Sequence, residues 1–331
     1  MAAASTGRGI VLAAASGMKN LQHLLVVATT CGVTLAVAVL TEPGATEAAA
    51  DAPDRTLTLT ALVRDFRAAH ERNGHPDFQA FAGRVHLGLV EPELGPDDKP
   101  VMADAAGWQL KRDYRDEAGR PINPWLVRDG TIEAAREGRI QRTGARRLTS
   151  PERFDQWYRD VPGVNVSYAV DLVLHEDPPG SGVFVYDSHG RRSTELNAWM
   201  QGLPIRGFFP INGRGWGNYR FHHRGSTNFH FTTELATTFT YREDAGYVFG
   251  FSGDDDLWVF IDGRLVIDLG GVHPEATQWV DLDELDWLED GETYAMHIFH
   301  AERRTVQSNF RVETTIPLRP RAAVQAFDAY D

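Results

Sequence analysis

The sequence predicts an all-β fold: an antiparallel β-sandwich with long inserted loops and one or two short helices. Most apolar segments are short, rich in aromatic and β-branched residues, and bounded by Gly, Pro, Asn or Asp. Two segments alternate strictly between polar and apolar residues, as half-buried strands do. The dipeptide Asp262-Gly263 between two apolar runs is typical of a two-residue hairpin turn, because both positions tolerate positive φ angles.

In chain order, residues 56–63 and residues 166–174 are the two alternating segments, and each predicts a strand. Ser150-Pro151 before Phe154, Trp157 and Tyr158 predicts a short helix, with an N-cap, a proline in the first turn and one apolar face. The remaining predicted strands are residues 182–186, 228–233, 237–241, 247–251 and the hairpin pair 257–261 and 264–268.

Between residues 91 and 147 the periodicity fails and charges of both signs accumulate. We interpret this region as long surface loops inserted between strands. Neither an internal repeat nor a linker is visible, so the sequence predicts one domain over residues 51–318, followed by a tail over residues 319–331.

Charge and cysteine content exclude several classes of protein. The chain has 331 residues, 46 acidic against 33 basic, and a formal net charge of −13, which disfavours nucleic acid as a partner. Cys31 is the single cysteine, so an intramolecular disulfide, a cysteine zinc site and a Cys-x-x-Cys redox pair are all excluded.

Residues 1–50 predict a signal peptide with a short leader. Residues 21–40 form an apolar run after Lys19, and cleavage could follow the small-residue pattern Ala36-Val37-Ala38 or fall in the small-residue stretch 46–50. This predicts a secreted or cell-surface protein. The alternative is a retained anchor, because about 20 apolar residues can span a bilayer, and only then would the membrane be a partner.

The acidic turn Gly253-Asp254-Asp255-Asp256 lies directly before an apolar strand. Adjacent carboxylates repel one another unless a cation or hydrogen-bond donors offset their charge. Two of them converging on one point could hold Ca²⁺, which prefers oxygen ligands. The alternative is a solvated acidic turn that caps the strand.

Several separated motifs resemble the fibro-slime domain of secreted bacterial and slime-mould proteins. They are FSGDDDLWVFIDGRLVIDLGGVH at 251–273, IFHAERRTVQSNFRVETT at 298–315, GFFPING at 207–213, NFHFTTEL at 228–235, FDQWYRDVPGVN at 154–165 and VRDFRAAHERNGHPDFQAF at 63–81. That domain is similar to the β-sandwich module of anthrax protective antigen, the PA-fourteen domain of adhesins, flocculins and glycosidases.

The resemblance implies a calcium site. In sugar-binding PA-fourteen domains two consecutive aspartates, joined by a cis peptide bond, hold a Ca²⁺ ion that ligates sugar hydroxyls. Their pattern places this pair at Asp254 and Asp255, with Gly253 where the family has a small hydroxyl residue. A further ligand of the family, an asparagine on a second loop, falls near Glu302, and Asn309 is the second candidate for this position.

Other residues are candidate ligand contacts. Sugars pack their C–H faces on flat rings, so Trp216 and Tyr219 in a glycine-rich loop could form a platform; the alternative is that the loop buries Trp216 in a small apolar cluster. His273 belongs to the fibro-slime motif and either orders its loop by hydrogen bonding or contacts ligand.

A rival metal site for Zn²⁺ or Cu²⁺ would use the histidines. His297 and His300 are three residues apart on a predicted strand, so they face opposite sides and a site shared by these two is disfavoured. The other histidines of this candidate site are His222, His223, His230 and His273.

We therefore expect a secreted, non-catalytic module that binds an extracellular polysaccharide or glycan with the help of Ca²⁺. Two alternatives stay open. One is a structural or protein-binding module of the extracellular matrix, in which calcium only stabilises the fold. The other is a glycoside hydrolase, whose two carboxyl groups would lie about 5 to 9.5 Å apart.

Overall fold

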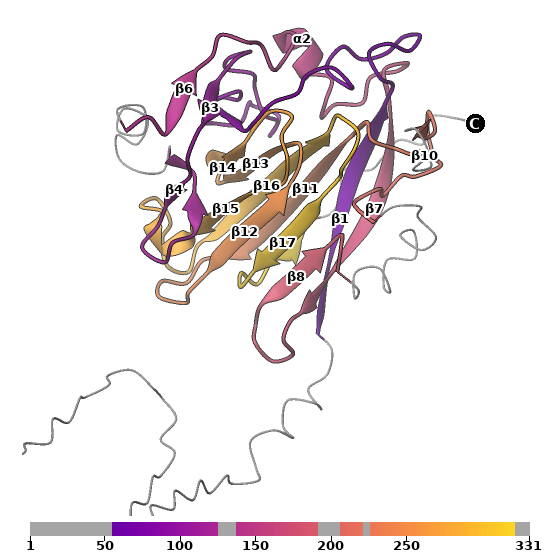
Figure 1. Ribbon diagram of the computed structural model, residues 1–331. Helices are drawn as coiled ribbons and strands as arrows, with labels where there is room; N and C mark the ends of the chain where they lie inside the picture. Colours follow the sequence, from indigo (N-terminus) through magenta and orange to yellow (C-terminus); the bar gives the residue numbers. More distant parts are fainter. Residues whose placement is uncertain (1–54, 125–136, 191–205, 221–225, 322–331) are drawn as a thin grey trace, which may run out of the picture. The chain divides into compact units, whose positions relative to one another are not determined.

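The computed structural model describes residues 55–124, 137–190, 206–220 and 226–321 (Figure 1). The predicted leader over residues 1–50 lies outside these ranges, as do His222 and His223. No helix in the described part of the chain is long and apolar enough to span a membrane.

The fold is nearly all β, as predicted. One large sheet has the strand order β14-β13-β16-β11-β1-β7-β8-β17-β12-β15-β5-β4. Its longer strands are β1 (Thr56–Phe66), β7 (Asn165–Glu176), β11 (Phe231–Thr240), β12 (Val248–Gly253), β13 (Asp256–Ile261), β14 (Arg264–Leu269), β15 (Ala276–Asp281), β16 (Thr293–Glu302) and β17 (Phe310–Thr314). Its short strands are β4 (Tyr114–Arg115), β5 (Pro121–Ile122), β8 (Phe184–Asp187) and β18 (Arg319–Pro320), the last of which pairs with β11.

Strand pairing is antiparallel throughout this sheet, except where β5 meets β15 in parallel. β1 pairs with β7 along its whole length, from Thr56 opposite His175 to Phe66 opposite Asn165 (Figure 1). Both predicted alternating strands are therefore confirmed. They are neighbours in the sheet although about a hundred residues separate them in the chain.

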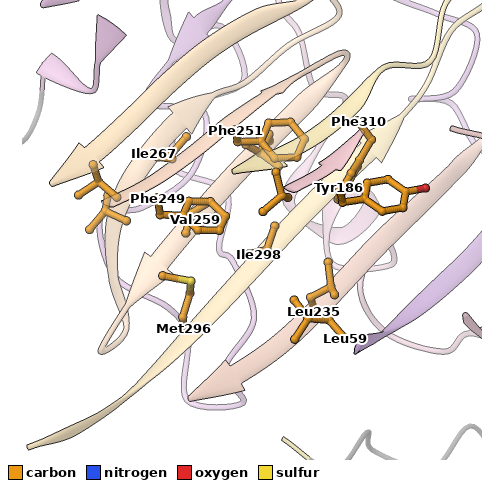
Figure 2. Packing of buried hydrophobic residues seen from close by; sticks show 14 of the residues in the cluster. Leu59, Tyr186, Leu235, Phe249, Phe251, Val259, Ile267, Met296, Ile298 and Phe310 are labelled. Atoms are coloured by element: carbon orange, nitrogen blue, oxygen red, sulfur yellow. The ribbon is translucent and has the colours of Figure 1, made fainter. Parts of the chain in front are cut away.

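The main core lies between the two halves of this sheet. Val259, Ile298 and Leu235 of β13, β16 and β11 face Phe249 and Phe251 of β12 (Figure 2). Burial of these side chains away from water is the main stabilising contribution to such a sandwich.

A second core covers the outer face of β13 and β16. It contains Phe154 of the short helix α2 (Pro151–Phe154), together with Trp157, Trp258 and Phe299. All six residues of β13 are buried, because its alternate side chains enter the two cores. The predicted helix is confirmed: Ser150 is its N-cap, and the Ser150 side chain accepts a hydrogen bond from the Arg153 N–H.

The Asp262-Gly263 hairpin is confirmed between β13 and β14, with φ angles of 53° and 74° at the two turn residues. The prediction for residues 91–147 is wrong in part. This region contributes β3 (Trp108–Leu110) and β6 (Ile140–Arg142), which form a three-stranded sheet with β2 (His86–Leu87), as well as β4 and β5. These strands have only two or three residues, too few to produce a visible alternation.

Candidate functional site

The acidic turn lies in a row of residues where neighbouring strands end, and these strand ends form one edge of the large sheet. Asp256 pairs with Ala301, and the next residue, Glu302, pairs with Phe231 of β11. A pocket of about 210 Å³ opens at this edge. It is lined by Ala82, Gly83, Asp254, Asp255, Val272, His273, Pro274, Arg304, Thr305, Val306 and Gln307.

The acidic turn links β12 to β13, and its Asp254–Asp255 peptide bond is cis, as the resemblance implied. The Asp254 N–H donates to the Asn309 carbonyl at 3.3 Å, and the Asn309 N–H donates to Asp254 Oδ1. A Cβ atom at Gly253 would lie 2.5 Å from the Asn309 carbonyl oxygen and 2.5 Å from the Phe251 ring. The packing around the turn therefore leaves no room for the small hydroxyl residue of the family pattern.

Both aspartates are almost completely buried, with 3% of Asp254 and 5% of Asp255 exposed. Asp255 Oδ1 accepts from the His273 N–H at 3.2 Å, and its Oδ2 accepts from the Arg303 N–H at 3.1 Å. The carboxylates are thus held by backbone N–H groups, while no cationic side chain is paired with either of them in the described residues.

Glu302 lies fully buried behind this pair. Its Oε1 accepts from the Arg304 N–H at 3.1 Å, whereas its Oε2 is buried and has no hydrogen-bond partner among the described residues. A buried carboxylate oxygen without a partner is costly, so Glu302 Oε2 is a candidate contact for a bound cation.

Burial dominates the electrostatics of the three carboxyl groups. Burial raises the pKa of Asp254 from 3.8 to about 7. Burial, and then the charge of Asp254, raise the pKa of Asp255 well above its usual value. Burial, followed by the charges of Asp255 and Asp254, does the same to the pKa of Glu302. A bound cation would offset these penalties and keep all three groups ionised.

The carboxylate and amide groups of the pocket suit a hard cation that takes oxygen ligands, but the number of side-chain carboxylates that could bind it is limited. No group of three or more His, Cys, Asp or Glu side chains within the described ranges is arranged to hold a metal ion. A calcium site here would therefore use Asp254 and Asp255 together with amide or carbonyl oxygens, and Asn309 already contacts the Asp254 carboxylate.

Asp256, the third acid of the turn, has a separate structural role. Its Oδ2 accepts from Arg303 Nε at 2.6 Å, and both side chains are completely buried. Asp256 Oδ1 accepts from the Gly271 N–H at 2.5 Å. No local pattern indicates that Arg303 pairs with Asp256, because the two residues are 47 positions apart in the chain.

His273 lies in the pocket wall. Its ring nitrogens are 2.8 Å from the Pro274 carbonyl oxygen and 3.2 Å from that of Leu269. Burial lowers its pKa, so the ring is neutral and donates to one of these two carbonyls. His273 thus ties its own loop to the end of β14.

The structure does not bring Trp216 and Tyr219 into the pocket. The Trp216 loop, defined as residues 212–219, is attached to the end of β1, because the Trp216 N–H donates to the buried carboxylate of Asp65. Trp216 is 37% exposed, so the alternative of an indole buried in a small cluster is wrong.

The two strand histidines face opposite sides, as predicted. His300 packs against Phe310 in the main core, with ring centroids 5.2 Å apart, while His297 stacks on Phe299 of the second core. A metal site shared by these two is excluded.

Part of the chain is similar to a known domain family. Residues 210–322 match the family described as the PA14 domain, and this range includes the acidic turn, Glu302 and Asn309. The match thus covers about a third of the 331-residue chain. The PA-fourteen resemblance is thereby confirmed.

The chain is also similar to proteins of Dictyostelium discoideum. It is 31% identical to protein psiQ over 273 residues, which cover 80% of this chain and 21% of psiQ. It is 32% identical to protein psiD over 265 residues, which cover 78% of this chain and 46% of psiD. The matched region thus spans between about a fifth and about a half of these relatives, and it extends well upstream of the PA14 match.

Among solved structures, the chain resembles a PA14 sugar-binding domain from an RTX adhesin, with 15% identity and a TM-score of 0.20, over 30% of this chain and 50% of that one. It also resembles a β-glucosidase from Kluyveromyces marxianus in complex with glucose, with 17% identity and a TM-score of 0.20, over 26% of this chain and 11% of the enzyme.

Proposed function

We propose that this chain is an extracellular carbohydrate-binding or adhesion module that acts without catalysis and depends on Ca²⁺. The observation that carries the proposal is the pair Asp254 and Asp255. These two adjacent, nearly buried carboxylates line a pocket open to solvent, and neither forms a salt bridge with a cationic side chain in the part of the chain that the structure describes. The ligand class follows from the motif resemblance, and the PA14 domain of the RTX adhesin is likewise described as sugar-binding.

Asp254 and Asp255 would hold the ion, with the Asn309 side chain as a third oxygen donor. Glu302, fully buried behind the pair, would fix the position of these ligands, because no three acidic side chains among the described residues are grouped to hold an ion. A bound Ca²⁺ ion supplies open coordination positions for hydroxyl oxygens. The pocket of about 210 Å³ is smaller than the roughly 300 to 1,000 Å³ of drug-sized sites, so it suits one sugar ring.

The geometry of the pocket favours binding over hydrolysis. A glycosidase needs two carboxyl groups that flank the scissile bond, typically about 5 to 9.5 Å apart. The carboxylates that line this pocket, Asp254 and Asp255, are consecutive residues of one turn and hence lie on one wall.

The alternative in which calcium only stabilises the fold differs from the proposal in one respect: it predicts that no sugar binds.

We expect the wild-type protein to bind a subset of glycans on an array in the presence of Ca²⁺, and to lose this binding when EGTA removes the ion. Asp254→Asn/Asp255→Asn should abolish the signal. This variant should fold, because neutral amides avoid the cost of burying two charges.

A matched control is Asp97→Asn/Asp98→Asn, which removes two consecutive but exposed aspartates and changes the net charge equally. It should bind as wild type does. Calcium binding without any glycan signal would favour the structural module, and glycan binding that persists in EGTA would contradict the proposed mechanism.

A further inference from the structure

Trp216 is an exposed aromatic residue on a loop that is nevertheless firmly held. Asp65 Oδ1 accepts from Asn228 Nδ2 at 2.6 Å, while its Oδ2 accepts from the Trp216 N–H. A Cβ atom at Gly215 would lie 2.2 Å from Asp65 Oδ2, so only glycine permits this approach. Buried hydrogen bonds to the backbone therefore fix the loop, and the indole contributes no core packing.

Two asparagines complete the attachment of the Trp216 loop. Asn212 Oδ1 accepts from the Asn228 N–H at 3.1 Å, and Asn218 Nδ2 donates to the Ser226 carbonyl at 2.9 Å. A rigid loop that presents an exposed aromatic ring is preorganised for contact, because little conformational entropy is lost when a ligand binds.

The loop and the acidic pocket lie at the same edge of the large sheet. Asp65 of β1 pairs with Phe231 of β11, Phe231 pairs with Glu302 of β16, and the neighbouring Ala301 pairs with Asp256 of β13. The anchor of the loop is thus three strands from the acidic turn. At about 4.8 Å per strand, this corresponds to roughly 14 Å along the edge.

The segment formed by residues 67–83 connects the two places. At one end, the Arg67 guanidinium lies 3.3 Å from the centroid of the Trp216 ring and covers one of its faces. Further along, Gln79 Nε2 donates to Thr305 Oγ1 at 3.0 Å, and Thr305 lines the pocket. Ala82 and Gly83, at the other end, also line the pocket.

We propose that the Trp216 loop is a second carbohydrate contact, so that the module binds a glycan chain of several units along this edge rather than one terminal sugar. The inference rests on the proposed function, because the first unit occupies the pocket. The Trp216 ring is flat and apolar, and the Arg67 guanidinium holds one of its faces. The C–H face of a sugar ring can pack on the other face, and this contact needs no charge on the sugar.

The test uses fragments of glucan, mannan, galactan and xylan, one to six units long, with affinities measured in the presence of Ca²⁺. For the wild type, affinity should rise with fragment length. Trp216→Ala should weaken binding of the longer fragments by about 3- to 10-fold and leave the shortest bound fragment unaffected. Trp216→Phe should restore part of the loss, because it keeps a flat ring.

Trp279→Ala is the matched control, since Trp279 of β15 also packs with an arginine, Arg120, at 5.9 Å. It should change no affinity. If affinity does not rise with fragment length, or rises equally in Trp216→Ala and the wild type, this inference is overturned but the calcium-dependent pocket is not. Failure of every fragment to bind in a calcium-dependent manner overturns both.

Discussion

Replacing Arg303 by alanine should destabilise the protein by about 3 to 5 kcal/mol, because it leaves a buried charge without its partner. Arg303 and Asp256 are each completely buried and are joined by a contact of 2.6 Å. The guanidinium also donates to the Arg147 carbonyl at 3.1 Å and lies 4.9 Å from the centroid of the Trp157 ring. Burial alone would lower the pKa of Arg303, but Asp256, Asp77 and Asp255 raise it, so the group is charged.

Urea denaturation of the wild type and of Arg303→Ala measures this destabilisation as a change in the free energy of unfolding. Arg242→Ala is a suitable control, because Arg242 is 57% exposed and lies 3.6 Å from Asp290, and it should cost less than about 1 kcal/mol. The double variant Arg303→Met/Asp256→Leu should recover much of the loss, since it removes both charges. A cost below about 1 kcal/mol for Arg303→Ala would show that the buried pair does not hold the acidic turn in place.

In the absence of calcium, the wild type should lose stability relative to Asp254→Asn/Asp255→Asn as the pH rises from 5 to 8. The folded-state pKa of Asp254, about 7, lies above its usual value of 3.8. Between these values the folded chain binds more protons than the unfolded chain, so the free energy of unfolding falls as pH rises. For Asp254 alone the change between pH 5 and pH 8 amounts to about 2.6 kcal/mol.

The comparison with the amide variant is needed because several buried histidines act in the opposite direction. Burial lowers the pKa of His75 and of His300 from 6.5 to about 4, which makes stability rise with pH between those values. Both proteins share these histidines, so their contribution cancels in the difference. Thermal denaturation at several pH values in EGTA measures that difference, and a constant difference over this range would refute the assigned electrostatics.

The local elements were predictable where a pattern of several residues specified them. The Asp262-Gly263 turn and the alternation in residues 56–63 and 166–174 each carry enough signal within one segment. The strands within residues 91–147 do not, because pairs of two or three residues depend on neighbours supplied by the folded chain.

The site was predictable only for the residues that share a motif. Asp254 and Asp255 follow from the acidic turn, and the structure places Glu302 and Asn309 next to them. The contributions of Arg303 and of residues 79–83 depend on contacts across the fold; Gln79, for example, contacts Thr305 from 226 positions away. No local pattern encodes such contacts. The sequence indicated Trp216 as a ligand contact because its loop is rich in glycine. Its position about three strands from the pocket depends on strand pairing, which no local pattern specifies.

Calorimetric titration of Ca²⁺ into the metal-free protein tests the central claim most directly. The wild type and Asp97→Asn/Asp98→Asn should bind one ion each, whereas Asp254→Asn/Asp255→Asn should show no binding. Absence of calcium binding by the wild type, or equal binding by the Asp254→Asn/Asp255→Asn variant, would contradict the assignment of the acidic turn as a metal site.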